Sequence, residues 1–205
     1  MPKLSKNKNL PAAITNIRLC SALRNCGSLG VENAFVKSKS NHLFVYDDRT
    51  IGYTDWTDAE PDFPSKCFNV LNPNGLIIVL LPLDNRIITG ANTTKGGICD
   101  GMLLTEREMC LIEFKTDVTS SNNETIEKRA EGAINQLWHT YDGIIHPRCA
   151  NVSIAIDHLL SVDFHVVFDK DLEIIGVNAT LMEIRTRFLI ENKLNLYFDN
   201  EKRFE

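Results

Sequence analysis

Hydrophobic positions near the start of the chain predict helices and one strand. Residues 11–24 carry apolar side chains at close to helical spacing behind a proline, which predicts a helix. A Gly-Ser-Leu-Gly segment at 27–30 interrupts this spacing, and residues 31–36 fit a second, short helix. Residues 43–46 predict a short strand, whereas residues 53–64, rich in Asp, Pro and Thr, predict a loop.

From residue 72 onward the pattern predicts a β-sheet. After a turn sequence at 72–75, the apolar run 75–84 predicts a buried strand, and residues 84–90 predict its continuation or the next strand. Residues 98–104 and 109–115 predict two further strands, joined by a short polar turn. This part of the sequence therefore predicts a β-hairpin.

A long amphipathic helix is expected after the hairpin. Ser121 and Glu124 match a capping box that would start this helix. Apolar residues then recur with helical spacing, namely Ala130, Ala133, Ile134, Leu137 and Tyr141. Residues 150–156 and 162–168 predict two more strands, and the spacing of residues 180–193 predicts a further helix.

These elements predict an α/β fold with a mixed central sheet flanked by helices. At 205 residues, the chain has the length of one compact domain with additional elements. Residues 1–40 are expected to form a basic helical N-terminal segment. Residues 41–205 are expected to form the core, with a C-terminal helical and strand extension.

The charge is distributed unevenly between these two parts. The whole chain has a net charge of −5, but residues 1–40 hold seven basic residues and one acidic residue, Glu32. The segment therefore carries +6 and the remainder −11. A basic arm on an acidic body fits contact with phosphates, although a solvated helix face explains the same residues.

The cysteines and the apolar runs indicate neither a thiolate metal site nor a membrane segment. The six cysteines include no Cys-x-x-Cys pair, so we expect reduced, buried thiols. The longest apolar run, 76–83, contains Pro82 and is too short to span a bilayer. Because the N-terminal residues do not match a signal peptide either, we expect a cytoplasmic protein.

The hairpin carries a candidate metal site. Glu113 and Lys115 are two residues apart, so they project from one face of the sheet while Ile112 and Phe114 project from the other. Asp100 interrupts an otherwise apolar strand, where a carboxylate is costly without a positive neighbour. Mg²⁺ or Mn²⁺ held by Asp100 and Glu113 would supply that charge. Such a site suits phosphodiester hydrolysis, with Lys115 beside the attacking water and the backbone carbonyl of Phe114 as a further oxygen ligand.

This arrangement resembles the PD-(D/E)XK nuclease superfamily, in which an Asp on one strand of a hairpin and an (Asp/Glu)-x-Lys on the next form the metal site. Asp100, Glu113 and Lys115 occupy those three positions. Gly97 upstream of the Asp and Thr116 after the Lys are similar to the branch that contains recombination exonucleases and CRISPR-adaptation nucleases.

The resemblance runs from residue 76 to about residue 170 and implies a restriction-endonuclease-like αβββαβ core. It also implies a glutamine on the helix after the hairpin, and Gln136 is placed there to bond the attacking water or the phosphate. Tyr141 follows Gln136 by five residues where the family spacing is four, so its role is undecided. Some members add an acid from the first helix to the metal site, which makes Glu32 a further candidate ligand.

The (Asp/Glu)-x-Lys string is weak evidence when taken alone. It occurs twice, at 113–115 and at 191–193, and the second copy lies in a helical segment where charges are normally solvated. The position of the first copy, on a hairpin behind Asp100, favours a metal site over an ion pair at a strand end.

The sequence thus predicts a metal-dependent nuclease, an endonuclease or exonuclease that uses Mg²⁺ or Mn²⁺ and acts on nucleic acid, DNA rather than RNA. We expect targeting through a homo-oligomer or a partner subunit, as in restriction and anti-phage defence systems. Two alternatives stay open. One is a non-catalytic nucleic-acid-binding or assembly subunit with the same fold, and the other is an unrelated α/β module whose hairpin carries an ion pair.

Overall fold

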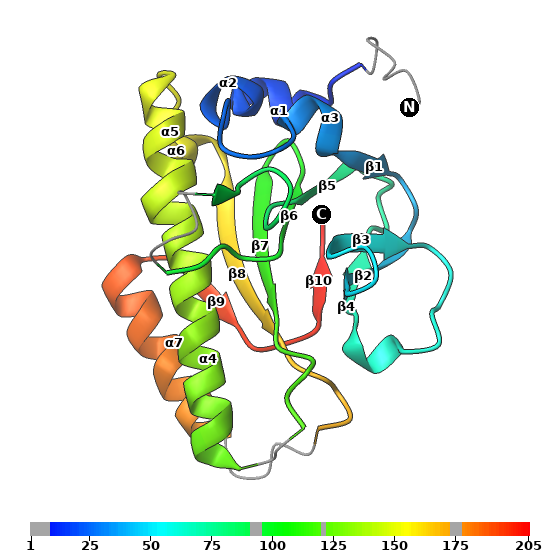
Figure 1. Ribbon diagram of the computed structural model, residues 1–205, viewed down its shortest axis with the longest axis vertical. Coiled ribbons are helices and arrows are strands. Elements are labelled where there is room, and N and C mark those ends of the chain that lie inside the picture. The colour runs from blue at the N-terminus through cyan, green and yellow to red at the C-terminus, as the bar shows by residue number, and fades with distance from the viewer. Residues whose placement is uncertain (1–8, 91–95, 120–121, 173–177) are drawn as a thin grey trace.

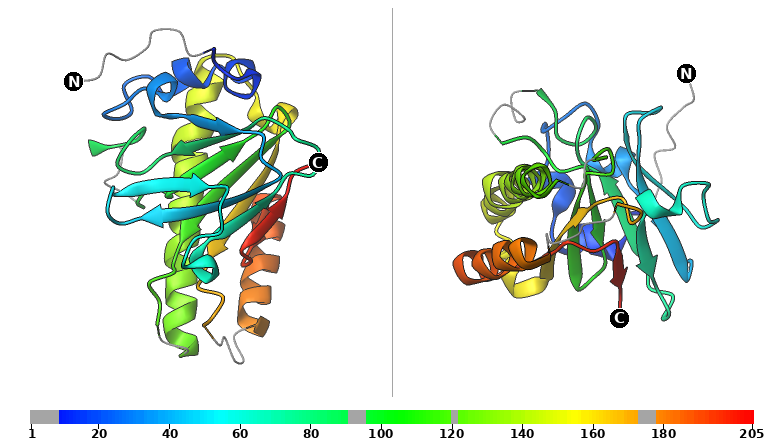
Figure 2. Two further views of the ribbon diagram at one scale, coloured as in Figure 1. Left: turned by 90° about the vertical axis from the view of Figure 1, so that its right-hand side faces the viewer. Right: turned by 90° about the horizontal axis from the view of Figure 1, so that it is seen from below.

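The protein is a mixed α/β structure built in three layers (Figures 1 and 2). The computed structural model describes residues 9–90, 96–119, 122–172 and 178–205. A six-stranded sheet forms the middle layer, with helices on one face and a four-stranded sheet on the other. The mixed α/β class is confirmed, but the second sheet was not predicted.

The six-stranded sheet has the strand order β1-β5-β6-β7-β8-β9. Its strands are β1 (Val36–Ser38), β5 (Ile78–Pro82), β6 (Gly101–Leu104), β7 (Glu108–Phe114), β8 (Ser161–Val167) and β9 (Asn195–Tyr197). Neighbouring strands are antiparallel from β1 to β7 and parallel from β7 to β9. The predicted hairpin is confirmed as β6 and β7, and the strand predicted at 162–168 is confirmed as β8.

The four-stranded sheet has the order β10-β4-β2-β3. Its strands are β2 (His42–Asp48), β3 (Tyr53–Thr57), β4 (Phe68–Leu71) and β10 (Glu201–Arg203). The loop predicted at 53–64 is wrong at its start, where β3 pairs with β2. Gly52, with a φ of 75°, closes the turn between these two strands, and that turn makes the pairing possible.

Helices α4 and α7 lie side by side along the helical face of the six-stranded sheet (Figures 1 and 2). The helices are α1 (Ala12–Asn16), α2 (Leu19–Ala22), α3 (Val31–Ala34), α4 (Asn123–Trp138), α5 (His146–Asn151), α6 (Ile156–Leu159) and α7 (Asn178–Asn192). A short turn of 3-10 helix, η1 (Pro64–Lys66), precedes β4, and a π-helical stretch, η3 (His139–Ile145), joins α4 to α5. Among the described residues, no helix is long and apolar enough to cross a membrane.

Strand β7 separates two hydrophobic cores. Met109 and Leu111 pack in the core shared with the helices, whereas Cys110, Ile112 and Phe114 pack in the core shared with the four-stranded sheet. This alternation is the one expected for a strand that is buried on both faces. It directs residue 113 toward the helical layer.

Three further predicted elements differ from the structure, and each of these ranges contains a residue in the left-handed conformation. The residues are Arg18 (φ 50°), Asn85 (φ 58°) and Ser153 (φ 64°). The helix predicted at 11–24 is divided into α1 and α2, and residues 84–90 form turns rather than a strand. Residues 150–156 end α5 and begin α6 instead of forming a strand. In each case the chain changes direction where apolar spacing alone suggests that it continues.

The long helix after the hairpin is confirmed as α4. Its N-cap is Asn122, whose side-chain oxygen accepts the backbone N–H groups of Glu124 and Thr125 at 2.9 and 3.4 Å. Ser121, the residue predicted to cap the helix, lies outside the described residues. The buried face of α4 contains Ala130 and Leu137, as the spacing predicts.

Candidate active site

The antiparallel register of the hairpin brings Asp100 next to Glu113. Gly101 pairs with Ile112, so the preceding and following residues lie side by side where β6 begins and β7 ends. The backbone N–H of Asp100 donates to Oε2 of Glu113 at 3.2 Å. In return, the backbone N–H of Phe114 donates to Oδ2 of Asp100 at 2.7 Å. Each carboxylate is thus held by the backbone of the opposite strand.

Lys115, which directly follows β7, and Gln136 of α4 complete this cluster. Nζ of Lys115 lies 2.5 Å from Oε1 of Glu113 and donates to Oε1 of Gln136 at 2.9 Å. The amide nitrogen of Gln136 donates to the carbonyl of Ile98 at 3.2 Å, which fixes the orientation of the amide. The structure therefore brings together the four side chains predicted to be catalytic.

Gly97 is required by the close approach of α4 to this segment. Its φ is 74°, and a Cβ atom at this position would stand 2.9 Å from Cγ of Gln136. A larger residue would be strained in its backbone and would push Gln136 away from Lys115. The glycine noted upstream of Asp100 therefore has a packing reason.

The two carboxyl groups are buried and hard to ionise. Glu113 is 2% exposed, and burial, followed by the charge of Asp100, raises its pKa well above the usual range. Burial is also the main reason that the pKa of Asp100 is raised to about 7. The N–H of Phe114 and the charge of Lys115 lower the pKa of Asp100, but by less than burial raises it. A further positive charge beside Asp100 and Glu113 would therefore stabilise their ionised forms.

Two acids that the sequence did not single out, Asp47 and Asp84, also act on this site. Both raise the pKa of Asp100 by charge repulsion, and burial raises the pKa of the partly buried Asp84. Asp84 follows β5 directly after a buried apolar run, a position that sequence reasoning can find. Asp47 belongs to β2 of the four-stranded sheet, and only the packing of the two sheets brings it near Asp100.

Glu32 and Tyr141 make their contacts elsewhere. Glu32 lies on α3. The pKa of the Cys20 thiol is raised mainly by burial of the thiol and, to a smaller extent, by the negative charge of Glu32. The hydroxyl of Tyr141 donates to Asp157 on α6. Neither side chain contributes to the hydrogen bonds that join Asp100, Glu113, Lys115 and Gln136.

The donor atoms fit a hard divalent cation, although they do not form a complete protein cage. Within the described ranges, no group of three or more His, Cys, Asp and Glu side chains is arranged to hold a metal ion. Mg²⁺ commonly takes only one or two protein carboxylates and completes its shell with water and substrate phosphate. Asp100 and Glu113 supply the two carboxylates of that pattern. Their raised pKa values show that a bound cation would stabilise their ionised forms.

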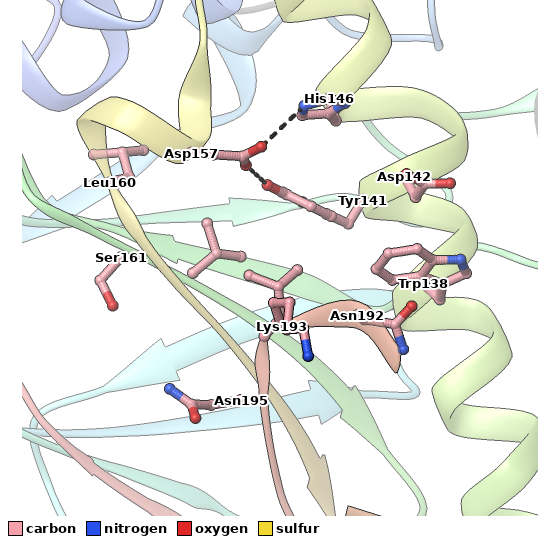
Figure 3. A pocket seen from close by; sticks show the side chains of 12 residues that line it. Trp138, Tyr141, Asp142, His146, Asp157, Leu160, Ser161, Asn192, Lys193 and Asn195 are labelled. Atoms are coloured by element: carbon pink, nitrogen blue, oxygen red, sulfur yellow. Dashed lines mark hydrogen bonds and ion pairs between the residues drawn. The ribbon is translucent and has the colours of Figure 1, made fainter. Parts of the chain in front are cut away.

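A separate cavity of about 510 Å³ lies between the π-helical stretch, the start of β8 and the end of α7 (Figure 3). In it, Asp157 accepts from Tyr141 and lies 3.2 Å from Nε2 of His146. The lining contains none of the four clustered residues. This network ties α6 to the helix that precedes it and is not part of the Asp100 site.

The six cysteines are free thiols, and five of them are buried, as expected from the sequence.

No protein-family model, curated protein or solved structure matches this chain.

Proposed function

We propose that this protein is a metal-dependent nuclease that hydrolyses phosphodiester bonds in nucleic acid. The observation that carries the proposal is the hydrogen-bonded cluster of Asp100, Glu113, Lys115 and Gln136, with two buried carboxyl groups of raised pKa. Strongly perturbed carboxyl groups beside a lysine are typical of functional sites. In a purely structural ion pair, the second carboxylate would have no role.

The order of elements supports a restriction-endonuclease-like core. Short helices precede three antiparallel strands, β5, β6 and β7, which are followed by α4 and by β8, parallel to β7. With β1 to β4 inserted between α3 and β5, this order is compatible with the αβββαβ core that the resemblance implies. In that core, one metal-binding acid lies on the first strand of the hairpin and the other on the second strand, as proposed here for Asp100 and Glu113.

Mg²⁺ or Mn²⁺ would be held by Asp100, Glu113 and the backbone carbonyl of Phe114. When bound, the ion supplies Lewis-acid polarisation of the phosphate and lowers the pKa of the attacking water. Because the N–H of Phe114 points to Asp100, we expect its carbonyl, on the same edge of the strand, to face the same space.

The side chains of this protein would position the water and stabilise charge. Lys115 lies against Glu113, so its ammonium group can orient the water or offset negative charge that develops on the phosphate. Gln136 holds Lys115 through Oε1 and is itself anchored to Ile98. The backbone N–H of Phe114 keeps the Asp100 carboxylate directed toward the site.

We further propose DNA rather than RNA as the substrate, with targeting by self-association or a partner subunit in a restriction or anti-phage system. The support for nucleic acid is the net charge of +6 in residues 1–40, although Lys3, Lys6 and Lys8 of that segment lie outside the described residues. The complete acid and lysine set favours a catalytic chain over a non-catalytic binding or assembly subunit.

Cleavage assays with Lys115→Ala test the proposal, because the second copy of the string provides a matched control. Lys193 is the exposed lysine of that copy, at the end of α7 (Figure 3). We expect wild type and Lys193→Ala to cleave labelled DNA with Mn²⁺ and to lose cleavage in a chelator. Lys115→Ala should lose about a hundredfold or more in rate. Cleavage that needs no metal, or equal rates for the two variants, would contradict the proposal.

A further inference from the structure

A groove of about 670 Å³ opens beside the candidate active site, between the end of β2, the loop before β4 and the segment after β7. We call it the β2 groove. It is lined by Tyr46, Asp47, Arg49, Phe63, Lys66 and Thr116, among others. Thr116 directly follows Lys115, and the charge of Asp47 acts on Asp100. A nucleic-acid strand lying in this groove would therefore pass beside residues that adjoin or act on the cluster of carboxylates.

An aromatic side chain is exposed at the wall of the β2 groove. Phe63 is 44% exposed and is the one aromatic residue among the exposed large hydrophobic side chains of the described residues. Its ring contacts Tyr46 edge to face, with centroids 5.4 Å apart at 81°. An edge-to-face contact covers at most one face of the Phe63 ring, and an exposed ring face can stack a nucleobase.

Cations line the same groove, and two of its three acids are engaged with other groups, whereas the third, Asp47, is exposed and attracts the charge of Arg49. Arg49 lies on the exposed turn after β2, and Lys66 is half exposed, 3.7 Å from Asp169. Asp117 is paired with Arg129 at 2.9 Å. The carboxylate of Asp48 accepts the backbone N–H groups of its own turn. Arg49 and Lys66 are therefore the groups of this groove that backbone phosphates would contact.

We propose that the β2 groove binds a single-stranded segment of the nucleic acid substrate, with a base on Phe63 and phosphates along Arg49 and Lys66. This inference rests on the proposed nuclease function. The bases of an intact duplex are stacked on one another, so only an unpaired base can use the face of Phe63. The groove thus selects single strands or frayed ends over blunt duplexes.

Binding of labelled oligonucleotides to the full chain tests the groove, with Ca²⁺ in place of Mn²⁺. The probes are a single-stranded DNA, the RNA of the same sequence and a blunt DNA duplex. Phe63→Ala and Phe63→Leu should weaken single-strand binding about tenfold, and Phe63→Trp should restore it, because only an aromatic face stacks a base. Ile190→Ala, which removes a 63% exposed apolar side chain from α7, is the control and should have no effect.

The cations are tested by salt dependence. Arg49→Ala should reduce the slope of log affinity against log salt for single strands by about 0.7, the value for one phosphate contact. Arg187→Ala, an exposed arginine on α7, should leave the slope unchanged. If Arg49→Ala reduces the salt slope for RNA only, or for DNA only, that result identifies which single strand the groove binds.

The outcomes separate this inference from the nuclease proposal. If Lys115-dependent cleavage occurs but Phe63 variants bind and cut single strands like wild type, the groove inference is overturned and the nuclease stands. If no cleavage occurs but single-strand binding still requires Phe63, the groove inference stands and the nuclease fails. Equal loss of single-strand and duplex binding in Phe63→Ala would also overturn the preference for single strands.

Discussion

At the scale of single residues, the function of the site depends on the charge state of Asp100. Its pKa is raised to about 7, first by burial and then by the charges of Asp47 and Asp84. A carboxyl group has to lose its proton before it can bind a metal ion. The affinity for Mn²⁺ should therefore increase as the pH rises through about 7, and should increase further at the higher pH where Glu113 loses its proton.

Replacing Asp47 by Asn should move this transition to lower pH. The substitution removes a negative charge that opposes ionisation of Asp100, so the carboxylate forms more easily. Mn²⁺ binding measured by calorimetry over a pH series checks the shift. Asp48→Asn is the control, because its amide oxygen can still accept the N–H groups of the turn. A midpoint that stays in place or moves upward in Asp47→Asn would contradict this account of the Asp100 pKa.

At the scale of elements, α4 and the start of η3 hold the segment that carries Asp100. The fully buried hydroxyl of Thr140 accepts the backbone N–H of Cys99 at 2.9 Å and donates to the carbonyl of Gln136 at 2.7 Å. Together with the bond from Gln136 to Ile98, it fixes the backbone directly before Asp100. The position of Asp100 is thus set by a helix distant in sequence.

Thr140→Val should reduce both stability and activity. It leaves the N–H of Cys99 without its acceptor, at a cost of about 1–3 kcal/mol. Urea unfolding gives the stability change, and cleavage rates give the effect on the position of Asp100. Thr186→Val on α7 is the matched control, since the exposed Thr186 hydroxyl donates only to Met182 of its own helix. Similar losses in the two variants would show that the contact to Cys99 has no special role.

Local sequence signals predicted the elements whose contacts are close along the chain. The hairpin and α4 follow from alternation, turn residues and helical spacing over short ranges, and they place Asp100, Glu113, Lys115 and Gln136. The pairing of β3 with β2, and of the distant β10 with β4, depends on which strands meet in space, which periodicity does not encode. For the same reason, Asp47 could not be predicted as part of the site.

At the scale of the whole molecule, a buried lysine joins the two sheets. Lys202 of β10 lies 2.8 Å from Glu108 of β7 and 2.7 Å from Asp163 of β8, and its side chain is 9% exposed. Burial lowers the pKa of Lys202, but the nearby acidic groups together raise it above its usual range. This contact fixes the four-stranded sheet, and therefore Asp47, against the sheet that carries the site.

Lys202→Met should destabilise the protein by roughly 3 kcal/mol, because it leaves two mostly buried carboxylates without their cation. Lys66→Met is the control. Its side chain is 51% exposed and its ion pair spans 3.7 Å, so a change below about 1 kcal/mol is expected. Urea unfolding of both variants measures the difference. Equal changes would mean that Lys202 does not hold the sheets together.

The most direct test of the central claim compares Glu113→Gln with Glu191→Gln, measuring Mn²⁺ affinity and DNA cleavage in the same samples. Both residues are the acids of Glu-x-Lys strings, but Glu113 is 2% exposed beside Asp100 whereas Glu191 is exposed on α7. The account predicts that Glu113→Gln loses both metal binding and cleavage, while Glu191→Gln keeps both. Undiminished cleavage by Glu113→Gln, or equal loss in the two variants, would contradict it.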